Sequence, residues 1–132
     1  MKGFTTDIET ATKTNVNFRK VLYTGKHSQL VLMSLRPNEE IGMETHPDND
    51  QFFRFEMGKG KCIIDENEFM VKDGDVVIVP SGAEHNVINT SGTEELKLYT
   101  LYSPAHHKDG IVRLTKAEAV QNEAEFDGVT TE

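Results

Sequence analysis

Four side chains of the types that bind metal ions stand in two separate stretches of the chain. Glu44 and His46 are two residues apart, Gln51 follows, and His85 lies in the second stretch. Two imidazole nitrogens, one carboxylate and one amide oxygen form a set of donors that suits Zn, Mn, Fe, Co or Ni. We therefore predict one divalent metal site formed by these four residues.

The spacing of these residues is compatible with β-strands. Residues i and i+2 face the same side of a strand, so Glu44 and His46 should project from one surface. The turn-prone residues 47–50 can then fold the chain back and bring Gln51 opposite this pair. His85 would have to come from a second hairpin.

Short apolar runs between turn residues fill the middle of the chain. Residues 29–35 are too short and too apolar for an amphipathic helix and are typical of a buried strand. In the alternating run that begins at Gln51, Met57 is expected on the same face as Gln51. Residues 76–79 are apolar on both faces, which predicts a central strand. The predicted strands are 16–23, 29–35, 51–57, 61–64, 68–71, 76–79, 85–89 and 96–102.

Strands at such even spacing, separated by Gly, Pro and Asn, indicate an all-β barrel or jelly roll. Residues 1–15 are expected to form an N-terminal arm, and residues 16–114 the barrel domain. Thr115 followed by Glu118 forms a capping box, which predicts a short C-terminal helix and then a tail within residues 115–132.

Two runs of the sequence resemble the two motifs of the cupin superfamily. In the first cupin motif a glycine, two histidines one residue apart, a glutamate and a closing glycine recur at the intervals seen in residues 38–58. Here Asn38 stands at the glycine, Glu44 at the first histidine and Gln51 at the glutamate, whereas His46 is kept. Residues 74–89 are similar to the second motif without any substitution.

This resemblance covers about residues 29–102 and implies a double-stranded β-helix, the cupin jelly-roll barrel, with a metal near one mouth. The donor set differs from the three-histidine, one-glutamate site of well-known cupin oxygenases. An alternative alignment places His46 at the first histidine and Asp48 at the second, which puts Gln51 close behind Asp48. The sequence leaves open whether Glu44 or Asp48 completes the site.

Cupins include oxygenases, isomerases, epimerases, decarboxylases and noncatalytic binders, so the fold does not determine the function. The chain also resembles stand-alone cupins described as mannose-6-phosphate isomerase-like. This implies a small-molecule metalloenzyme that uses the metal as a Lewis acid on a carbonyl or sugar-like substrate, of the isomerase or epimerase type or a dioxygenase. The alternative is a noncatalytic cupin that binds a carbohydrate or a small carboxylate. The basic residues near the motifs are Arg36, Arg54 and Lys59.

The remaining candidates are assigned structural roles. Adjacent histidines point in opposite directions in an extended chain, so we expect His106 and His107 to lie in a solvated loop. His27 follows a turn and requires no role. Cys62 is expected to be a small buried residue, because nothing in the sequence lowers the pKa of its thiol.

Length and charge narrow the function further. A chain of 132 residues fits a single domain, and its net charge of -8 would repel nucleic acid. No apolar run approaches the length that crosses a bilayer, so we expect no membrane partner. A single cysteine and the lack of an N-terminal apolar run suit the cytoplasm. Because edge strands often pair between chains, we expect a homodimer to which the N-terminal arm contributes.

Overall fold

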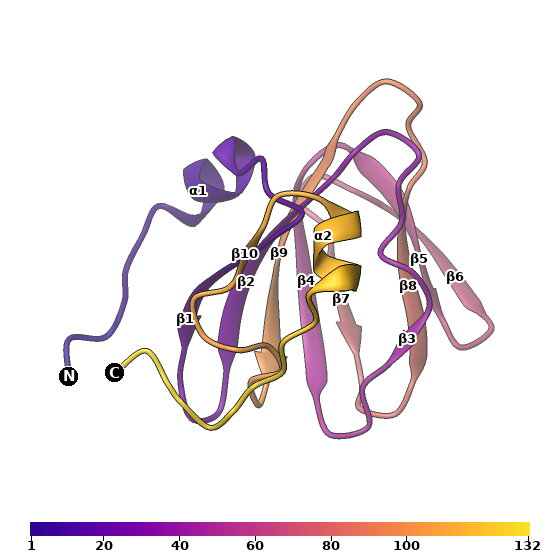
Figure 1. Cartoon of the computed structure of the whole chain (residues 1–132). Helices are drawn as coiled ribbons and strands as arrows, with labels where there is room; N and C mark the ends of the chain where they lie inside the picture. Colours follow the sequence, from indigo (N-terminus) through magenta and orange to yellow (C-terminus); the bar gives the residue numbers. More distant parts are fainter.

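Antiparallel β-sheet makes up most of the computed structural model, which describes residues 1–132. Two sheets face each other, one with strand order β10-β1-β2-β9-β4-β7 and the other with strand order β3-β8-β5-β6 (Figure 1). The strands are β1 (Arg19–Thr24), β2 (Gln29–Leu35), β3 (Glu44–Thr45), β4 (Asp50–Met57), β5 (Lys59–Ile64), β6 (Asn67–Lys72), β7 (Val76–Val79), β8 (Glu84–Asn89), β9 (Leu96–Ser103) and β10 (Val112–Arg113). The predicted all-β, double-stranded β-helix fold is confirmed.

The hydrophobic core lies between the two sheets and contains 18 buried residues. Val31 and Met33 alternate along β2, and Phe53 and Phe55 along β4, because every second side chain of a strand faces the same side. Cys62 approaches from β5 in the opposite sheet, and burial raises the pKa of its thiol to about 12. Cys62 is thus the buried, unreactive residue that the sequence predicts.

A short helix, α1 (Ile8–Thr14), lies in the segment for which the sequence analysis expected only an arm. The Asp7 side chain caps this helix by accepting a hydrogen bond from a backbone N–H of its first turn. Thr12 is fully buried, and the ammonium group of Lys97 in β9 donates to the carbonyl oxygen of Asn15 just beyond the helix. The N-terminal segment therefore packs on the larger sheet of its own chain.

Two details of the predicted strands are wrong. Strand β7 pairs with β4 alone and therefore lies at the edge of its sheet, not at its centre. The side chains of Val76 and Ile78 are 46% and 63% exposed. An apolar run does not reveal how many neighbours a strand has. In β4 the register shifts between Phe55 and Met57, so Glu56 is buried and Met57 is exposed instead of sharing the face of Gln51.

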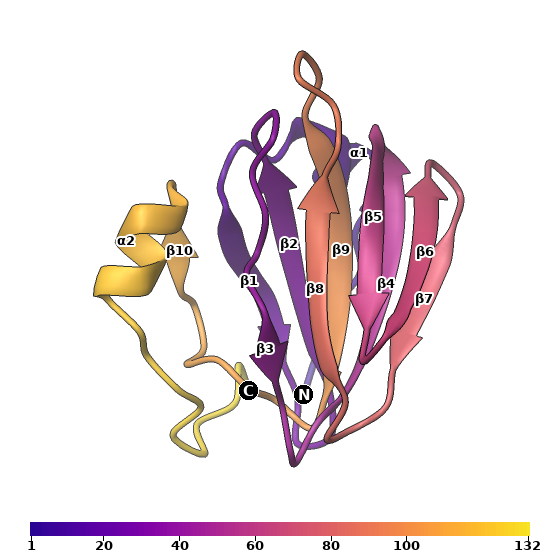
Figure 2. The ribbon, with the colours of Figure 1, turned by 90° about the vertical axis from the view of Figure 1, so that its right-hand side faces the viewer.

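The C-terminal helix, α2 (Lys116–Gln121), is confirmed together with its capping box. The Thr115 hydroxyl accepts a hydrogen bond from the backbone N–H of Glu118, and the Glu118 carboxylate accepts one from Leu114. Helix α2 and β10 lie beside β1, at the end of the larger sheet (Figure 2). Neither helix combines the length and the apolar character that a membrane crossing requires.

Candidate metal centre and adjoining cavity

The pairing of β3 with β8 brings the two predicted motifs together. Glu44 and His85 are direct partners in this antiparallel pair, so their side chains leave the sheet on the same side. His46 stands two residues beyond Glu44, where its carbonyl oxygen accepts a hydrogen bond of 3.0 Å from the backbone N–H of Gly82. Residues more than thirty positions apart are thus fixed side by side by backbone bonds alone.

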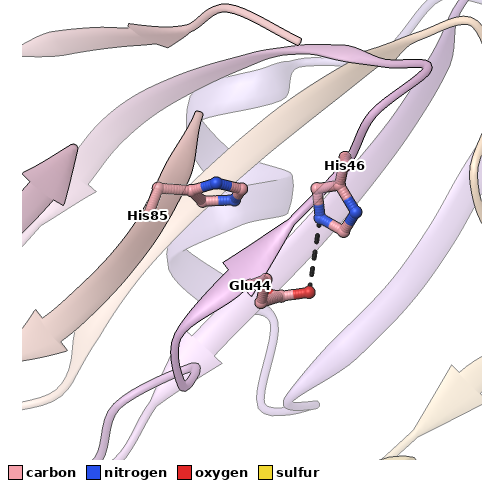
Figure 3. A group of neighbouring side chains, drawn as sticks. All are labelled: Glu44, His46 and His85. Atoms are coloured by element: carbon pink, nitrogen blue, oxygen red, sulfur yellow. Dashed lines mark ion pairs between the residues drawn. The ribbon is translucent and has the colours of Figure 1, made fainter. Parts of the chain in front are cut away.

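Glu44, His46 and His85 form a compact cluster (Figure 3). One potential ligand atom from each residue lies within 4.8 Å of those of the other two. The Glu44 carboxylate is 3.3 Å from Nε2 of His46, and the two imidazole rings are 5.2 Å apart between centroids. His46 and His85 are 6% and 3% exposed. This separation and burial allow all three residues to contact one ion.

The tautomer of His85 is set by its backbone neighbour. Nδ1 of His85 lies 3.1 Å from the carbonyl oxygen of Ala83, so Nδ1 carries the proton and donates it. Nε2 is then an acceptor, yet this buried atom has no hydrogen-bond partner. An imidazole whose second nitrogen donates to a backbone carbonyl is the usual arrangement of a metal-binding histidine.

Gln51 presents a second buried acceptor without a partner. Its amide nitrogen donates to the hydroxyl of Thr100 at 3.0 Å, which fixes the orientation of the amide group. Its Oε1 atom is left without a hydrogen bond. Buried polar atoms are nearly always satisfied, so the unsatisfied acceptors of His85 and Gln51 suit the binding of a cation.

Electrostatics keep Glu44 ionised. Burial raises the pKa of this carboxyl group, but the side-chain contact with His46 and the electrostatic influence of His46, His85 and Arg19 outweigh it and leave the pKa below its usual value. Glu44 is therefore an anion at neutral pH. One anionic and three neutral donors suit a borderline divalent ion.

The prediction for the adjacent histidines is wrong. His106 stacks against the predicted ligands, with its ring centroid 4.2 Å from that of His46, and His107 is only 8% exposed. The Oε1 atom of the buried Gln29 accepts hydrogen bonds from both backbone N–H groups, and Nε2 of His107 is 3.2 Å from the Tyr102 hydroxyl. These two hydrogen bonds tether β2 to the loop after β9. They join residues that are 77 and 78 positions apart in the chain, so the local sequence does not predict them.

A cavity of about 380 Å³ opens beside the cluster. Glu44 and His46 line one part of it, and His106 lines another. Two further lining residues, Arg19 and Arg113, were missed because they lie outside both motifs. In the sequence, only their residue type suggests a role in the site. The pairing of β1 with β10 brings them together, and these strands are separated by most of the chain.

The other candidates lie elsewhere. Asp48 is exposed and does not belong to the cluster that Glu44 forms. Arg54 lies 3.0 Å from the buried carboxylate of Glu56, and Arg36 and Lys59 are exposed. None of these basic residues lines the cavity.

Comparisons with known proteins agree with this fold. The family described as Cupin domain matches residues 31–102. The uncharacterized protein YrkC of Bacillus subtilis is 48% identical over 128 residues, which cover 92% of this chain and 68% of that protein. The crystal structure of BH2720 from Bacillus halodurans is 40% identical, with a TM-score of 0.89, over 92% of this chain and 96% of that one.

A more distant structure shares the fold alone. A protein described as a predicted oxalate decarboxylase from Thermotoga maritima is 23% identical with a TM-score of 0.56, over 60% of this chain and 68% of that one. The family match spans more than half of the chain and includes both motifs. The chain is therefore a member of the cupin family, with a Glu/His/His cluster suited to a metal inside its barrel.

Proposed function

We propose that Glu44, His46, Gln51 and His85 bind one divalent ion of Zn, Mn, Fe, Co or Ni, and that the chain is a metalloenzyme. The observation that carries this proposal is the cluster of one anionic carboxylate and two buried imidazoles, together with the buried acceptors without partners on His85 and Gln51. When bound, the ion would act as a Lewis acid on a carbonyl or hydroxyl oxygen of a small molecule.

Within this proposal His106 exchanges a proton with the substrate. The imidazole lines the cavity and is held between the rings of His46 and Tyr102. Burial, together with the charge of His46, lowers its pKa below the usual value, so the ring is neutral at pH 7 and can accept a proton. Glu44 is the second candidate base in a state where it does not bind the metal.

We favour an isomerase or epimerase acting on a carbonyl or sugar-like substrate, in line with the resemblance to mannose-6-phosphate isomerase-like cupins. A neutral Gln51 in place of a glutamate separates this site from that of the familiar cupin oxygenases. An isomerase would turn over its substrate without oxygen, whereas a dioxygenase would consume oxygen. A noncatalytic carbohydrate or carboxylate binder would show neither reaction, although its ligand would raise the melting temperature.

Elemental analysis of protein purified without added metal tests the metal site. We expect close to one divalent ion per chain in the wild type and less than a tenth of that in His46→Ala and His85→Ala. His27→Ala is the matched control, because His27 is exposed and does not belong to the cluster. Unchanged metal content in both cluster variants would refute the site.

We further propose a cytoplasmic homodimer. The buried free thiol of Cys62 suits a reducing compartment. Strands β6 and β7 end their sheets and carry exposed apolar side chains such as Met70 and Ile78, which a second copy could cover. Light scattering in solution should give twice the mass of one chain, and the mass of a single chain would rule the dimer out.

A further inference from the structure

Two arginines face each other across a strand pair. Arg19 at the start of β1 and Arg113 at the end of β10 are direct partners in the antiparallel ladder. Like charges in this position destabilise a sheet. Local arrangements that cost stability are expected at functional sites, which makes this pair a candidate for ligand binding.

No carboxylate of the protein lies within ion-pair distance of either guanidinium group. Neither Arg19 nor Arg113 forms an ion pair, and the Nε atom of each is buried without a hydrogen-bond partner. Arg113 is held in place by donating to the carbonyl oxygens of Val112 and Asn122, at 3.2 and 3.0 Å. Arg19 lies over the ring of Phe18, 5.5 Å from its centroid.

Both arginines line the same cavity as the cluster. Arg19 and Arg113 share it with Glu44, His46 and His106. A ligand in this cavity of about 380 Å³ could contact the arginines and the metal centre together.

We propose that Arg19 and Arg113 bind the carboxylate of a small hydroxy- or oxo-carboxylate whose other oxygen faces the metal centre. This inference rests on the proposed metal site and adds the substrate class to it. Arginine is suited to this task because its planar fork matches the two oxygens of a carboxylate.

The surroundings favour a carboxylate over a phosphate ester. Glu123 and Glu125 line the same cavity, and the chain carries a net charge of -8. Each additional negative charge on the ligand increases the repulsion from these groups. A singly charged carboxylate meets less repulsion than a doubly charged phosphate.

NMR of the arginine Nε–Hε groups tests the inference on the metal-loaded protein. Pyruvate is the probe, pyruvamide is its neutral analogue, and methyl phosphate tests the other anion. We expect pyruvate to shift the signals of Arg19 and Arg113 but not those of Arg36 and Arg54, and pyruvamide to shift none. Equal effects of pyruvate and pyruvamide, tighter binding of methyl phosphate, or no shift with pyruvate would each overturn the proposal.

Substitutions separate this inference from the metal site. Arg19→Gln and Arg113→Gln should each weaken pyruvate binding at least tenfold, as expected for loss of a charged hydrogen-bonding partner, and keep their metal. Arg36→Gln is the matched control. Because the repulsion is removed, the melting temperature of Arg19→Gln without ligand should not fall. Arg113→Gln also loses the hydrogen bonds to Val112 and Asn122, so its melting temperature is not compared. Wild-type affinity for pyruvate in both variants would overturn the carboxylate site. The metal site is tested separately by His46→Ala, which should lose the metal while its arginine signals stay unchanged.

Discussion

At the scale of single residues, the candidate metal centre depends on which atoms lack a partner. His85 uses Nδ1 for the carbonyl oxygen of Ala83, and Gln51 uses its amide nitrogen for Thr100. Each is thereby left with one free acceptor inside the barrel. The same side chains in a merely structural role would have both ends satisfied.

Gln51→Glu should tighten metal binding. The new carboxylate adds a negative charge to the proposed set of donors, and it can accept a hydrogen bond from the Thr100 hydroxyl, which rotates freely. We expect affinity for Zn to rise about tenfold at pH 7, because an anionic oxygen is a stronger donor than an amide. Competition with a fluorescent chelator measures the change. An unchanged affinity would show that residue 51 does not bind the ion.

His107 should make stability depend on pH. Burial, assisted by the charges of Arg19, His106 and His46, lowers its pKa from 6.5 to about 2. The unfolded chain therefore binds a proton below pH 6.5 that the folded chain does not, and stability is lost as the pH falls through this range. Between pH 7 and pH 5 the wild type should lose about 2 kcal/mol more than His107→Gln.

Urea unfolding at several pH values measures this difference. His27→Gln is the control, since His27 is exposed and its loss should leave the pH dependence of the wild type unchanged. Identical pH profiles for the wild type and His107→Gln would contradict the buried neutral state.

The spacing of residues in the sequence predicted the metal-binding side of the site but not the two arginines. Glu44 and His46 share a face because they are two apart on one strand, and both motifs have recognisable spacing. Even the departure at Asn38 has a physical basis, because its φ of 63° lies in the left-handed region that glycine and asparagine accept. Arg19 and Arg113 depend on a pairing between distant strands, which spacing does not encode.

At the scale of elements, turn residues predicted where strands begin and end better than which strands are neighbours. Most of the predicted strands are present within two or three residues of their expected ends. The edge position of β7 and the bulge in β4 follow from tertiary pairing, which the local pattern does not contain. Helix α1 was missed because it is short, although Asp7 and Thr10 carry a capping signal.

Helix α2 matters to the site through Arg113, which donates to the carbonyl oxygen of the helix C-cap residue, Asn122. Thr115→Ala removes the N-terminal cap and should lower the free energy of unfolding by about 1 kcal/mol. Thr115→Ser retains a hydroxyl acceptor and is the matched control. Urea unfolding compares the two variants, and equal stability of Thr115→Ala and the wild type would show that the cap contributes nothing.

At the scale of the whole molecule, the two motifs contribute residues to one interior. Strand β3 ends the smaller sheet, and β1 with β10 ends the larger one. The cavity is lined by residues of these edges and of the C-terminal segment. Glu44 and His85 come from the smaller sheet, whereas Arg19, Arg113 and Gln51 come from the larger one. The family motifs predict the barrel and the donor side, whereas the C-terminal segment that carries Arg113 lies outside the matched residues 31–102.

Anomalous X-ray diffraction from a crystal loaded with Zn tests the central claim most directly. We predict a single strong peak inside the barrel, about 2.0–2.2 Å from Nε2 of His46, Nε2 of His85 and an oxygen of Glu44, with Oε1 of Gln51 as the fourth ligand. A peak that contacts only one of these residues, or one that appears only on the outer surface, would contradict the account.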